Sequence, residues 1–150
     1  ISGSDFTFLD GSNKFIPHVF EISMGVDRSI YCILENCFKI ESERNLLKLQ
    51  FHLSPIKVAV FPLVNKDGLP QIASDLYDKL KMTFYSVYDA SGSIGRRYRR
   101  QDEIGTAFCV TIDYDTLNDN TVTIRNRNSM DQIRIKTSEI SDHIANQVNI

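Results

Sequence analysis

The sequence contains no tryptophan, only three cysteines and three histidines, and no long apolar run. Cys32, Cys37 and Cys109 form no C-x-x-C pair, and the histidines are scattered, so neither a disulfide framework nor a zinc site is indicated. No stretch approaches the roughly 18 apolar residues of a membrane helix, and no basic segment leads into an apolar one as in a secretory signal. We therefore expect reduced thiols, no bound metal and no membrane span.

Net charge is also small. The 150 residues carry 17 Lys and Arg against 19 Asp and Glu, a formal charge of -2. This balance argues against binding nucleic acid through bulk charge, so any such contact must be local. Hydrophobic residues make up 42% of the chain, which is typical of a globular protein with a core. The sequence begins at Ile1 without methionine, and we expect the natural start to lie upstream.

One stretch departs from this balance by placing four arginines and a tyrosine in five consecutive positions, Arg96-Arg97-Tyr98-Arg99-Arg100. Like charges at helical spacing repel, so the stability of the local helix does not explain the cluster. Guanidinium groups match phosphate oxygens and stack on bases, and a tyrosine adds a stacking surface. The alternative is a solvated basic face. Because the cluster is so dense and glycines precede it, we expect an anionic ligand.

The first third of the chain predicts two strands, a helix and a linker. Residues 5–16 are typical of two strands around a turn, with the second continuing to Ser23. An amphipathic helical stripe follows. Its apolar positions are Ile30, Ile33, Leu34, Cys37 and Phe38. Residues 39–54 are more polar and are predicted to be a linker with a short extended piece at 46–49. The predicted domains are therefore 1–53 and 54–150.

Apolar strands and amphipathic helices alternate through the second predicted domain. The predicted strands are 57–63, 84–89, 107–113, 121–125 and 132–136, and the predicted helices are 69–80, 94–104 and a terminal helix from 137. Asp67 is a candidate cap, and Pro70 fits the first helical turn. This order predicts an α/β fold, a mixed five-stranded sheet with flanking helices. Right-handed crossovers would bring the start of the arginine-rich helix to the carboxyl edge of the parallel strands, where such sheets bind ligands.

A carboxylate, a hydroxyl and a guanidinium lie close together where the first predicted helix begins. Glu21 and Ser23 end the strand, and Arg28 lies on the first helical turn. The carboxylate suits an ammonium group and the arginine a phosphate, so a small zwitterion and a phosphate could bind side by side. Alternatively, Arg28 pairs with Asp27 or Glu35.

These motifs together resemble one enzyme family. Glu21-x-Ser23-x-Gly25-x-x-Arg28 resembles motif 3 of class II aminoacyl-tRNA synthetases in the glycyl variant. Five later stretches resemble the C-terminal anticodon-binding domain of the eukaryotic and archaeal-type dimeric glycyl-tRNA synthetases. They are residues 57–63, 67–70, 91–98, 102–106 and 124–130. The resemblance covers nearly the whole chain, and it implies the anticodon-binding fold preceded by a strand-strand-helix remnant of the antiparallel catalytic sheet.

The resemblance implies roles for the motif 3 residues. Glu21 and Ser23, with Ile22 between them, would bind the substrate glycine. Arg28 would bind ATP and act as a catalytic residue by stabilising charge at the phosphate. Ile22 replaces a usual proline, which loosens the backbone there.

The resemblance also implies a nucleic-acid partner, the anticodon arm of tRNA(Gly). The implied tRNA-binding residues are Arg96, Arg97, Tyr98, Arg99, Arg100, Asp102 and Glu103. Asp102 or Glu103 could accept a hydrogen bond from a cytosine amino group. The alternative is that these carboxylates simply pair with neighbouring arginines.

Motifs 1 and 2 of class II synthetases are not found in the sequence. We therefore expect a fragment of a glycine–tRNA ligase that cannot aminoacylate by itself and that binds the anticodon arm weakly. The complete enzyme would use ATP with Mg²⁺, would be a homodimer, and would be cytoplasmic, with a mitochondrial form as a further expectation. The alternative function is a non-catalytic, synthetase-like module that binds nucleic acid. The retention of Glu21, Ser23 and Arg28 argues against this alternative.

Overall fold

The computed structural model describes residues 6–18 and 20–148. The chain divides into two compact units, Ile1–Tyr31 and Cys32–Ile150. The helix α1 (Val26–Cys37) runs across the division. The division falls earlier than the boundary predicted near Ser54, and the assignment of residues 1–53 to a catalytic domain stays a prediction.

The first unit contains the predicted hairpin. Strands β1 (Phe8–Asp10) and β2 (Asn13–Phe15) pair antiparallel around a turn in which Gly11 has a φ of 61°. The prediction that the second strand continues to Ser23 is wrong, because residues 20–25 have no regular secondary structure. A strand needs a hydrogen-bonded neighbour, and no described strand pairs with these residues.

The helix α1 forms where the apolar spacing predicts it, but it ends at Cys37, so Phe38 lies outside the helix. None of the described residues of α1 is buried. Its apolar stripe therefore has no core to cover within the described part of the chain.

In the second unit, a hairpin follows α1 where a linker is predicted. Strands β3 (Phe38–Ile40) and β4 (Asn45–Leu47) pair antiparallel. Leu46 and Leu49 are buried, and β4 packs against the helix α3 (Ile94–Ile104). Gly105, which follows α3 with a φ of 85°, lies so close that a Cβ there would be 3.0 Å from the Leu47 carbonyl oxygen. The extended piece predicted at 46–49 overlaps β4, but the rest of the linker prediction is wrong, because this segment forms a hairpin, with Leu46 and Leu49 buried against the rest of the second unit.

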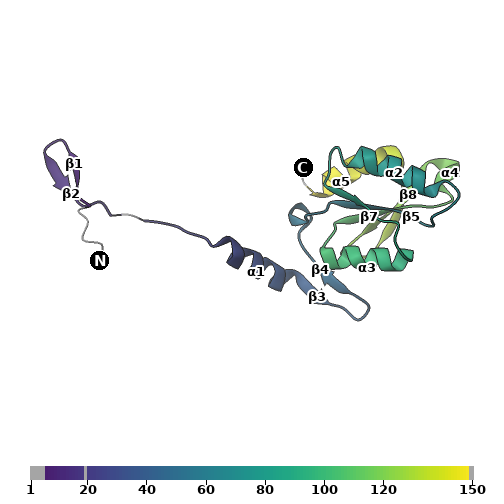
Figure 1. The fold of residues 1–150 in the computed structure, drawn as a ribbon, viewed down its shortest axis with the longest axis horizontal. Helices are drawn as coiled ribbons and strands as arrows, with labels where there is room; N and C mark the ends of the chain where they lie inside the picture. Colours follow the sequence, from purple (N-terminus) through teal and green to yellow (C-terminus); the bar gives the residue numbers. More distant parts are fainter. Residues whose placement is uncertain (1–5, 19, 149–150) are drawn as a thin grey trace. The chain divides into compact units, whose positions relative to one another are not determined.

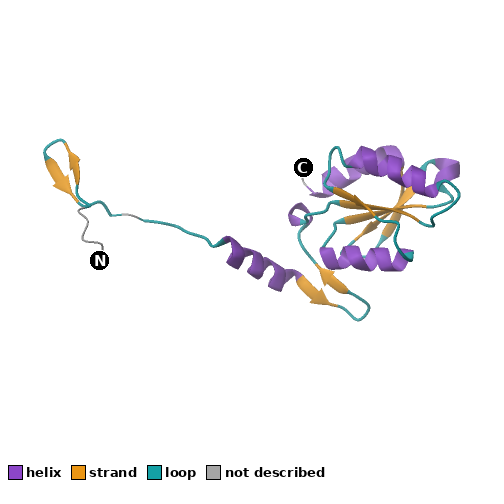
Figure 2. Cartoon of the chain, in the orientation of Figure 1, coloured by secondary structure: helices purple, strands orange, loops and turns teal. Residues whose placement is uncertain are grey.

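The predicted mixed five-stranded sheet is confirmed, with the strand order β6-β5-β7-β8-β9. The strands β6, β5 and β7 are parallel, and β8 and β9 continue the sheet antiparallel. Their bounds are β5 (Val58–Pro62), β6 (Ser86–Tyr88), β7 (Phe108–Ile112), β8 (Thr121–Asn126) and β9 (Gln132–Lys136). Figures 1 and 2 show this sheet edge-on between two layers of helices.

Helices cover both faces of the sheet (Figure 1). The helices α2 (Leu69–Leu80) and α5 (Ile140–Val148) lie on one face, and α3 lies on the other. Short helical turns occupy the loops at Phe51–Leu53, Thr116–Asp119 (α4) and Thr137–Glu139. Every residue of β5 and β7 is buried, as expected for parallel strands covered on both faces.

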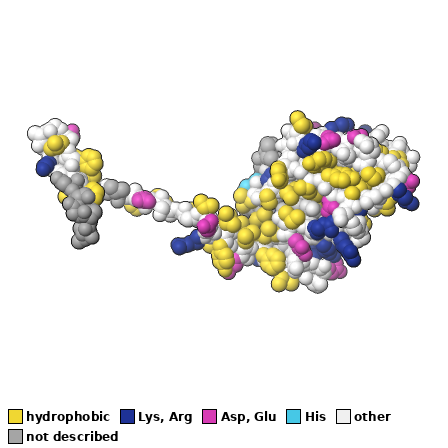
Figure 3. Space-filling view, in the orientation of Figure 1, with side chains coloured by type: hydrophobic (Ala, Val, Ile, Leu, Met, Phe, Trp, Pro, Cys, Tyr) yellow, Lys and Arg dark blue, Asp and Glu magenta, His cyan; other side chains and the backbone are white. Residues whose placement is uncertain are grey.

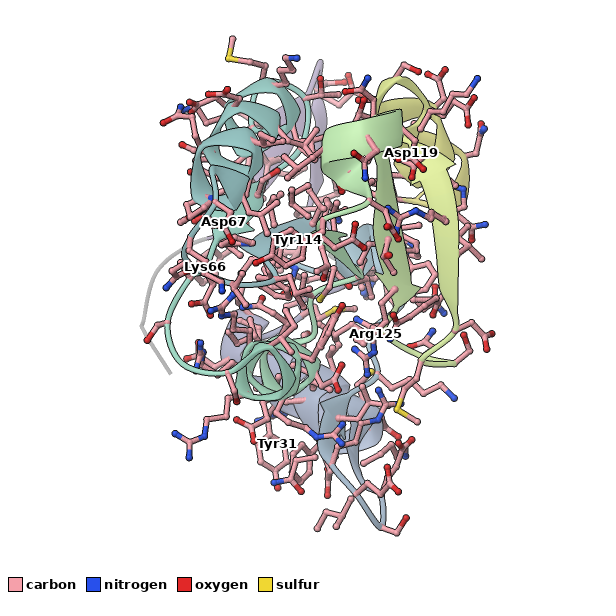
Figure 4. The ribbon with its side chains drawn as sticks, turned by 90° about the vertical axis from the view of Figure 1, so that its right-hand side faces the viewer. Tyr31, Lys66, Asp67, Tyr114, Asp119 and Arg125 are labelled. Atoms are coloured by element: carbon pink, nitrogen blue, oxygen red, sulfur yellow. The ribbon has the colours of Figure 1, made fainter. Side chains whose placement is uncertain are left out.

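The helix α2 confirms the apolar spacing and Pro70 in its first turn, but not its predicted cap. Gly68, with a φ of 81°, is the N-cap residue and makes no side-chain cap. Asp67 instead accepts a hydrogen bond of 2.6 Å from the Tyr114 hydroxyl (Figure 4). The carboxylate therefore joins two loops rather than capping the helix.

The main core lies between the sheet and the α2–α5 layer, and a smaller apolar cluster lies under α3. The main core includes the predicted inward residues Ile140 and Ile144. The smaller cluster comprises Ala59, Phe61 and Cys109, with Ile94 and Tyr98 of α3 packed on them. Since this cluster, with Val87 of β6, covers β5, β6 and β7 but not β8 or β9, the α3 side of β8 and β9 is left for polar side chains.

Candidate nucleic-acid interface

Polar side chains line the α3-side face of β8 and β9. Residues paired across antiparallel strands share a face of the sheet. One row runs from Cys109 through Arg125 to Gln132, and the next runs from Thr111 through Thr123 to Arg134. The intervening residues Val122 and Ile124 face the main core. This strict alternation makes a basic, hydrogen-bonding floor beside α3.

Two cavities that share Tyr98 and Gln132 lie between α3 and this floor. The larger, of about 480 Å³, is lined by Ser93, Gly95, Arg96, Tyr98, Arg99, Arg125, Met130 and Gln132. The smaller, of about 260 Å³, is lined by Leu63, Ile94, Tyr98, Thr111, Asp113, Thr123 and Gln132. We call these two cavities together the α3 groove. In Figure 3, Lys and Arg side chains gather on the part of the larger unit where α3 lies in Figure 1.

The helix α3 forms over the predicted residues and presents its side chains to different surroundings. Arg96 and Arg99 are three residues apart, so they lie next to each other on the helix. Arg96 is exposed and the Arg99 side chain is 42% exposed. These two arginines are therefore accessible to a ligand in the groove, and their contact with tRNA stays a prediction.

Tyr98 is held in place at the centre of the α3 groove. Its hydroxyl lies 2.6 Å from the Thr111 hydroxyl, and its ring meets Phe61 edge-on. The Arg125 guanidinium lies over the ring, 4.9 Å from its centroid. Burial raises the pKa of the Tyr98 hydroxyl, so it stays protonated and able to hydrogen-bond at neutral pH. The ring is a fixed part of the groove.

Asp102 is fully buried and is surrounded by arginines. Its two carboxylate oxygens accept hydrogen bonds of 2.9 and 3.1 Å from Arg125. Arg44 and Arg99 place a nitrogen 3.3 and 3.5 Å from its Oδ2. The prediction that Asp102 reads a base directly is contradicted by this burial, and its alternative, pairing with arginines, is observed. Glu103 is exposed, and its predicted base contact stays a prediction.

Arg97 is 2% exposed and holds the loop before α3 rather than a ligand. Its guanidinium donates to the carbonyl oxygens of Pro62, Ala90 and Gly92. The predicted contact between Arg97 and RNA is therefore wrong for this conformation. Successive helical residues point about 100° apart, and Arg97 points toward the loop instead of the groove.

Arg100 also has a partner inside the protein. Its guanidinium donates hydrogen bonds of 3.1 and 2.6 Å to Asp89 Oδ2. Burial opposes the charge of Asp89, but hydrogen bonds from Ser91 and Arg100 outweigh it and lower the pKa of the carboxyl. Arg100 lines neither cavity of the α3 groove. The predicted contact of Arg100 with RNA stays a prediction, and it would lie outside the groove.

Arg127 is a buried arginine that ties three segments together. Its guanidinium donates to the Leu49 carbonyl, to the Gly105 carbonyl at 2.6 Å and to the Ser54 hydroxyl at 2.9 Å. Burial lowers the pKa of the guanidinium to about 10, which still leaves it charged at neutral pH. Arg127 therefore fastens the segment after β4 to the sheet.

The predicted glycine- and ATP-binding residues lie in the first unit. Glu21, Ile22 and Ser23 belong to the segment without regular secondary structure, and Arg28 lies in the first turn of α1. All four are exposed. The described residues of this unit do not enclose a site around them, so these roles stay predictions.

Metal and membrane sites are not indicated in the described part of the chain. Among the described residues, no group of three or more His, Cys, Asp or Glu side chains could hold a metal ion. None of the described helices is long and apolar enough to cross a membrane.

Asp113 and Arg134, at the end of the α3 groove, form an ion pair that predicts a pH effect. Arg134 donates hydrogen bonds of 2.7 and 2.8 Å to the two carboxylate oxygens, and these bonds, with those from Thr116, lower the pKa of Asp113 to about 2. The unfolded carboxyl titrates higher, so the pair stabilises the fold above about pH 4 and loses its effect as pH falls toward 2. Urea unfolding should find Asp113→Asn less stable by at most about 1 kcal/mol at pH 6, with no difference near pH 2. An equal difference at both pH values would contradict this assignment.

Arg125, Gln132 and Arg134, which line or flank the α3 groove, are among the residues that the sequence did not predict as part of a site. A pattern in the sequence could have identified them. In both 121–126 and 132–136, polar and apolar residues alternate, which indicates strands with one polar face. The strands were predicted, but the face that the helix α3 leaves open was not.

Comparison with known proteins agrees with this fold. Residues 57–147 match the family described as "Anticodon binding domain". A solved RNA binding domain of threonyl-tRNA synthetase from Cryptosporidium parvum Iowa II superposes with a TM-score of 0.60 and 20% identity, covering 67% of this chain and 25% of that one. At this identity, the likeness supports the fold alone.

Sequence relatives are more specific. A glycine–tRNA ligase from Methanococcus maripaludis is 52% identical over 137 residues, which cover 91% of this chain and 24% of the relative. One from Treponema denticola is 42% identical over 159 residues, covering 98% and 35%, and one from Methanocaldococcus jannaschii is 48% identical over 132 residues, covering 87% and 23%. The chain thus spans about a quarter to a third of the length of these relatives. The predicted resemblance is confirmed: the chain belongs to the anticodon-binding domain family, in the form found in glycine–tRNA ligases.

Proposed function

We propose that this chain binds the anticodon arm of tRNA(Gly) in the α3 groove, as the anticodon-binding part of a glycine–tRNA ligase. The observation that carries the proposal is the larger cavity, where Arg96, Arg99 and Arg125 surround Tyr98 and Gln132. Three arginines line this one cavity, although the whole chain has a net charge of -2. Phosphates and unpaired bases are the ligands that this combination suits.

These residues differ in exposure, and we assign them different roles accordingly. Arg96 and Arg99 reach solvent, so they would contact the phosphates of the loop. Gln132 is exposed on the floor, and its side-chain amide can both donate to and accept from a base edge. Tyr98 is half-buried and lines both cavities, so its ring would offer the stacking surface for an unpaired base, with the 4% exposed Arg125 supporting the ring from behind. Specificity would then come from the floor and affinity from α3.

The activity of the complete protein follows as a second part of the proposal. We propose a ligase that activates glycine with ATP and transfers it to tRNA(Gly), with Mg²⁺ neutralising the ATP phosphates. Glu21 and Ser23 would bind the glycine, and Arg28 would bind ATP and stabilise charge at the reacting phosphate. These exposed side chains form only part of such a site, so residues elsewhere in the complete enzyme would have to complete it. The complete enzyme would be a homodimer in the cytoplasm or in mitochondria.

The alternative function is a non-catalytic module that uses the same groove to bind nucleic acid. In the complete protein, the exchange of labelled pyrophosphate into ATP in the presence of glycine distinguishes the two. Glycine-dependent exchange that disappears in Arg28→Ala supports the ligase. Specific binding of tRNA(Gly) without any exchange supports the non-catalytic module.

Fluorescence anisotropy with labelled RNA tests the binding proposal on this chain. One anticodon stem-loop carries cytosines at the second and third anticodon positions, and the other carries uracils there. We expect tighter binding to the cytosine loop and a preference that persists at two salt concentrations, because base contacts depend on salt less than phosphate contacts do. Equal and strongly salt-dependent binding to both loops would mean that the groove holds only the backbone. No binding to either loop would refute the proposal.

A further inference from the structure

The buried carboxylate of Asp102 lies directly behind the α3 groove. We propose that Asp102 is a positioning residue, which touches no RNA but holds Arg99 and Arg125 in the arrangement that RNA binding needs. This inference rests on the proposed function of the groove. It assigns a role to a residue that the sequence suggested as a direct reader of bases.

The contact between Asp102 and Arg125 fixes the guanidinium in a plane. Both terminal nitrogens of Arg125 donate, one to each carboxylate oxygen, at 2.9 and 3.1 Å. Such a two-point pair sets both the position and the orientation of the guanidinium. The same guanidinium lies over the Tyr98 ring, which Thr111 holds through its hydroxyl. Asp102 therefore determines how Arg125 and Tyr98 meet in the groove.

Asp102 also restrains the more exposed Arg99. Arg99 Nη1 lies 3.5 Å from Asp102 Oδ2, while its other terminal nitrogen lies 4.0 Å from the exposed Glu43. A long side chain loses rotamer freedom when it binds a ligand, and a partial restraint beforehand reduces that loss. Asp102 therefore favours a conformation in which Arg99 already lines the cavity.

Asp102 is the one carboxylate on which three arginine side chains converge. Arg44, Arg99 and Arg125 come from three different segments and converge on it. Burial works against the charge of Arg125, but the hydrogen bonds and charge of Asp102 outweigh burial and raise the pKa of the guanidinium. Without the carboxylate, the three guanidinium groups would repel one another. The groove would keep its positive charge, but its arginine side chains would no longer be held in fixed positions.

Simple electrostatics and positioning predict opposite results for Asp102→Asn. The substitution removes a negative charge beside a phosphate-binding groove, so charge alone predicts tighter RNA binding. If Asp102 positions the arginines, the variant should bind RNA about tenfold more weakly, because a hydrogen bond between a charged arginine and the RNA is lost when the arginine is no longer held in place. Preference for the cytosine loop should fall as well. Circular dichroism and urea unfolding would show that the variant is folded at the assay temperature.

Asp89→Asn is the matched control. Asp89 also pairs with an α3 arginine, Arg100, and the substitution makes the same change in charge. Arg100 lines neither cavity, so RNA affinity should stay within about twofold of the original protein or rise slightly. Equal losses of affinity in Asp89→Asn and Asp102→Asn would mean that any α3 ion pair has this effect, and would overturn the proposal.

Arg125→Lys decides the matter if Asp102→Asn does not fold. Lysine keeps the positive charge but cannot bind the carboxylate at two points or stack flat on Tyr98. We expect RNA affinity to fall by about tenfold, despite the unchanged charge. If Arg125→Lys, or a folded Asp102→Asn, binds RNA as tightly as the original chain, the positioning role is refuted. The proposed function fails separately, if the unchanged chain does not bind the stem-loop at all.

Discussion

Replacing Arg96 and Arg99 together with alanine should weaken binding of the anticodon stem-loop by about 100-fold, or about tenfold for each charged interaction removed. Both side chains line the larger cavity and both reach solvent. The dependence of affinity on salt should also flatten, by about 0.7 in the slope of log K against log salt for each phosphate that the protein no longer neutralises. Fluorescence anisotropy at several salt concentrations measures both quantities.

The control for this double substitution removes two charges from the opposite face of the sheet. Lys79 and Lys81 are exposed and lie in or just after α2, which covers the face away from α3 (Figure 1). Replacing both with alanine makes the same change in net charge, but it should lower affinity by no more than about threefold. Comparable decreases in the two double variants would mean that the RNA responds to total charge and that the α3 groove is not the binding site.

Replacing Arg127 with methionine should lower the free energy of unfolding by about 3 to 5 kcal/mol. The loss is large because the substitution removes a buried charged group together with its hydrogen bonds. Methionine fills similar space but donates no hydrogen bond. The Leu49 and Gly105 carbonyl oxygens and the Ser54 hydroxyl would lose the donor that now satisfies them. Urea unfolding followed by circular dichroism gives the difference directly.

Arg134→Met is the matched control for Arg127→Met. Arg134 also donates several hydrogen bonds, but its side chain is 33% exposed, so water can replace it. The expected loss of stability is about 1 kcal/mol or less. A loss for Arg127→Met no larger than this would show that the segment after β4 is held by its leucines alone. A large loss would show that the arginine is needed to fasten it.

The resemblance to anticodon-binding domains could be recognised because the evidence for it is local in sequence. Apolar runs such as 58–62 and the spaced leucines of α2 identify strands and helices without reference to the rest of the fold. The dense arginine cluster at 96–100 identified the helix beside which the groove lies. Where local pattern and final structure disagree, as at residues 16–18, 20–23 and 39–54, the missing information is which partner a segment packs against.

The use of each charged residue was decided by tertiary structure. From the sequence alone, the residues from Arg96 to Glu103 are predicted to form one ligand-binding set, because they are adjacent and nearly all are polar. In the fold, Arg97 turns to the loop carbonyls, Arg100 to Asp89, and Asp102 to an arginine 23 positions away on β8. The sequence by itself thus determined the order of the strands and main helices of the five-stranded sheet, the family and the position of the basic helix. Only packing decided which of its charges face a ligand, because the partners that bury the others come from strands and loops distant in the chain.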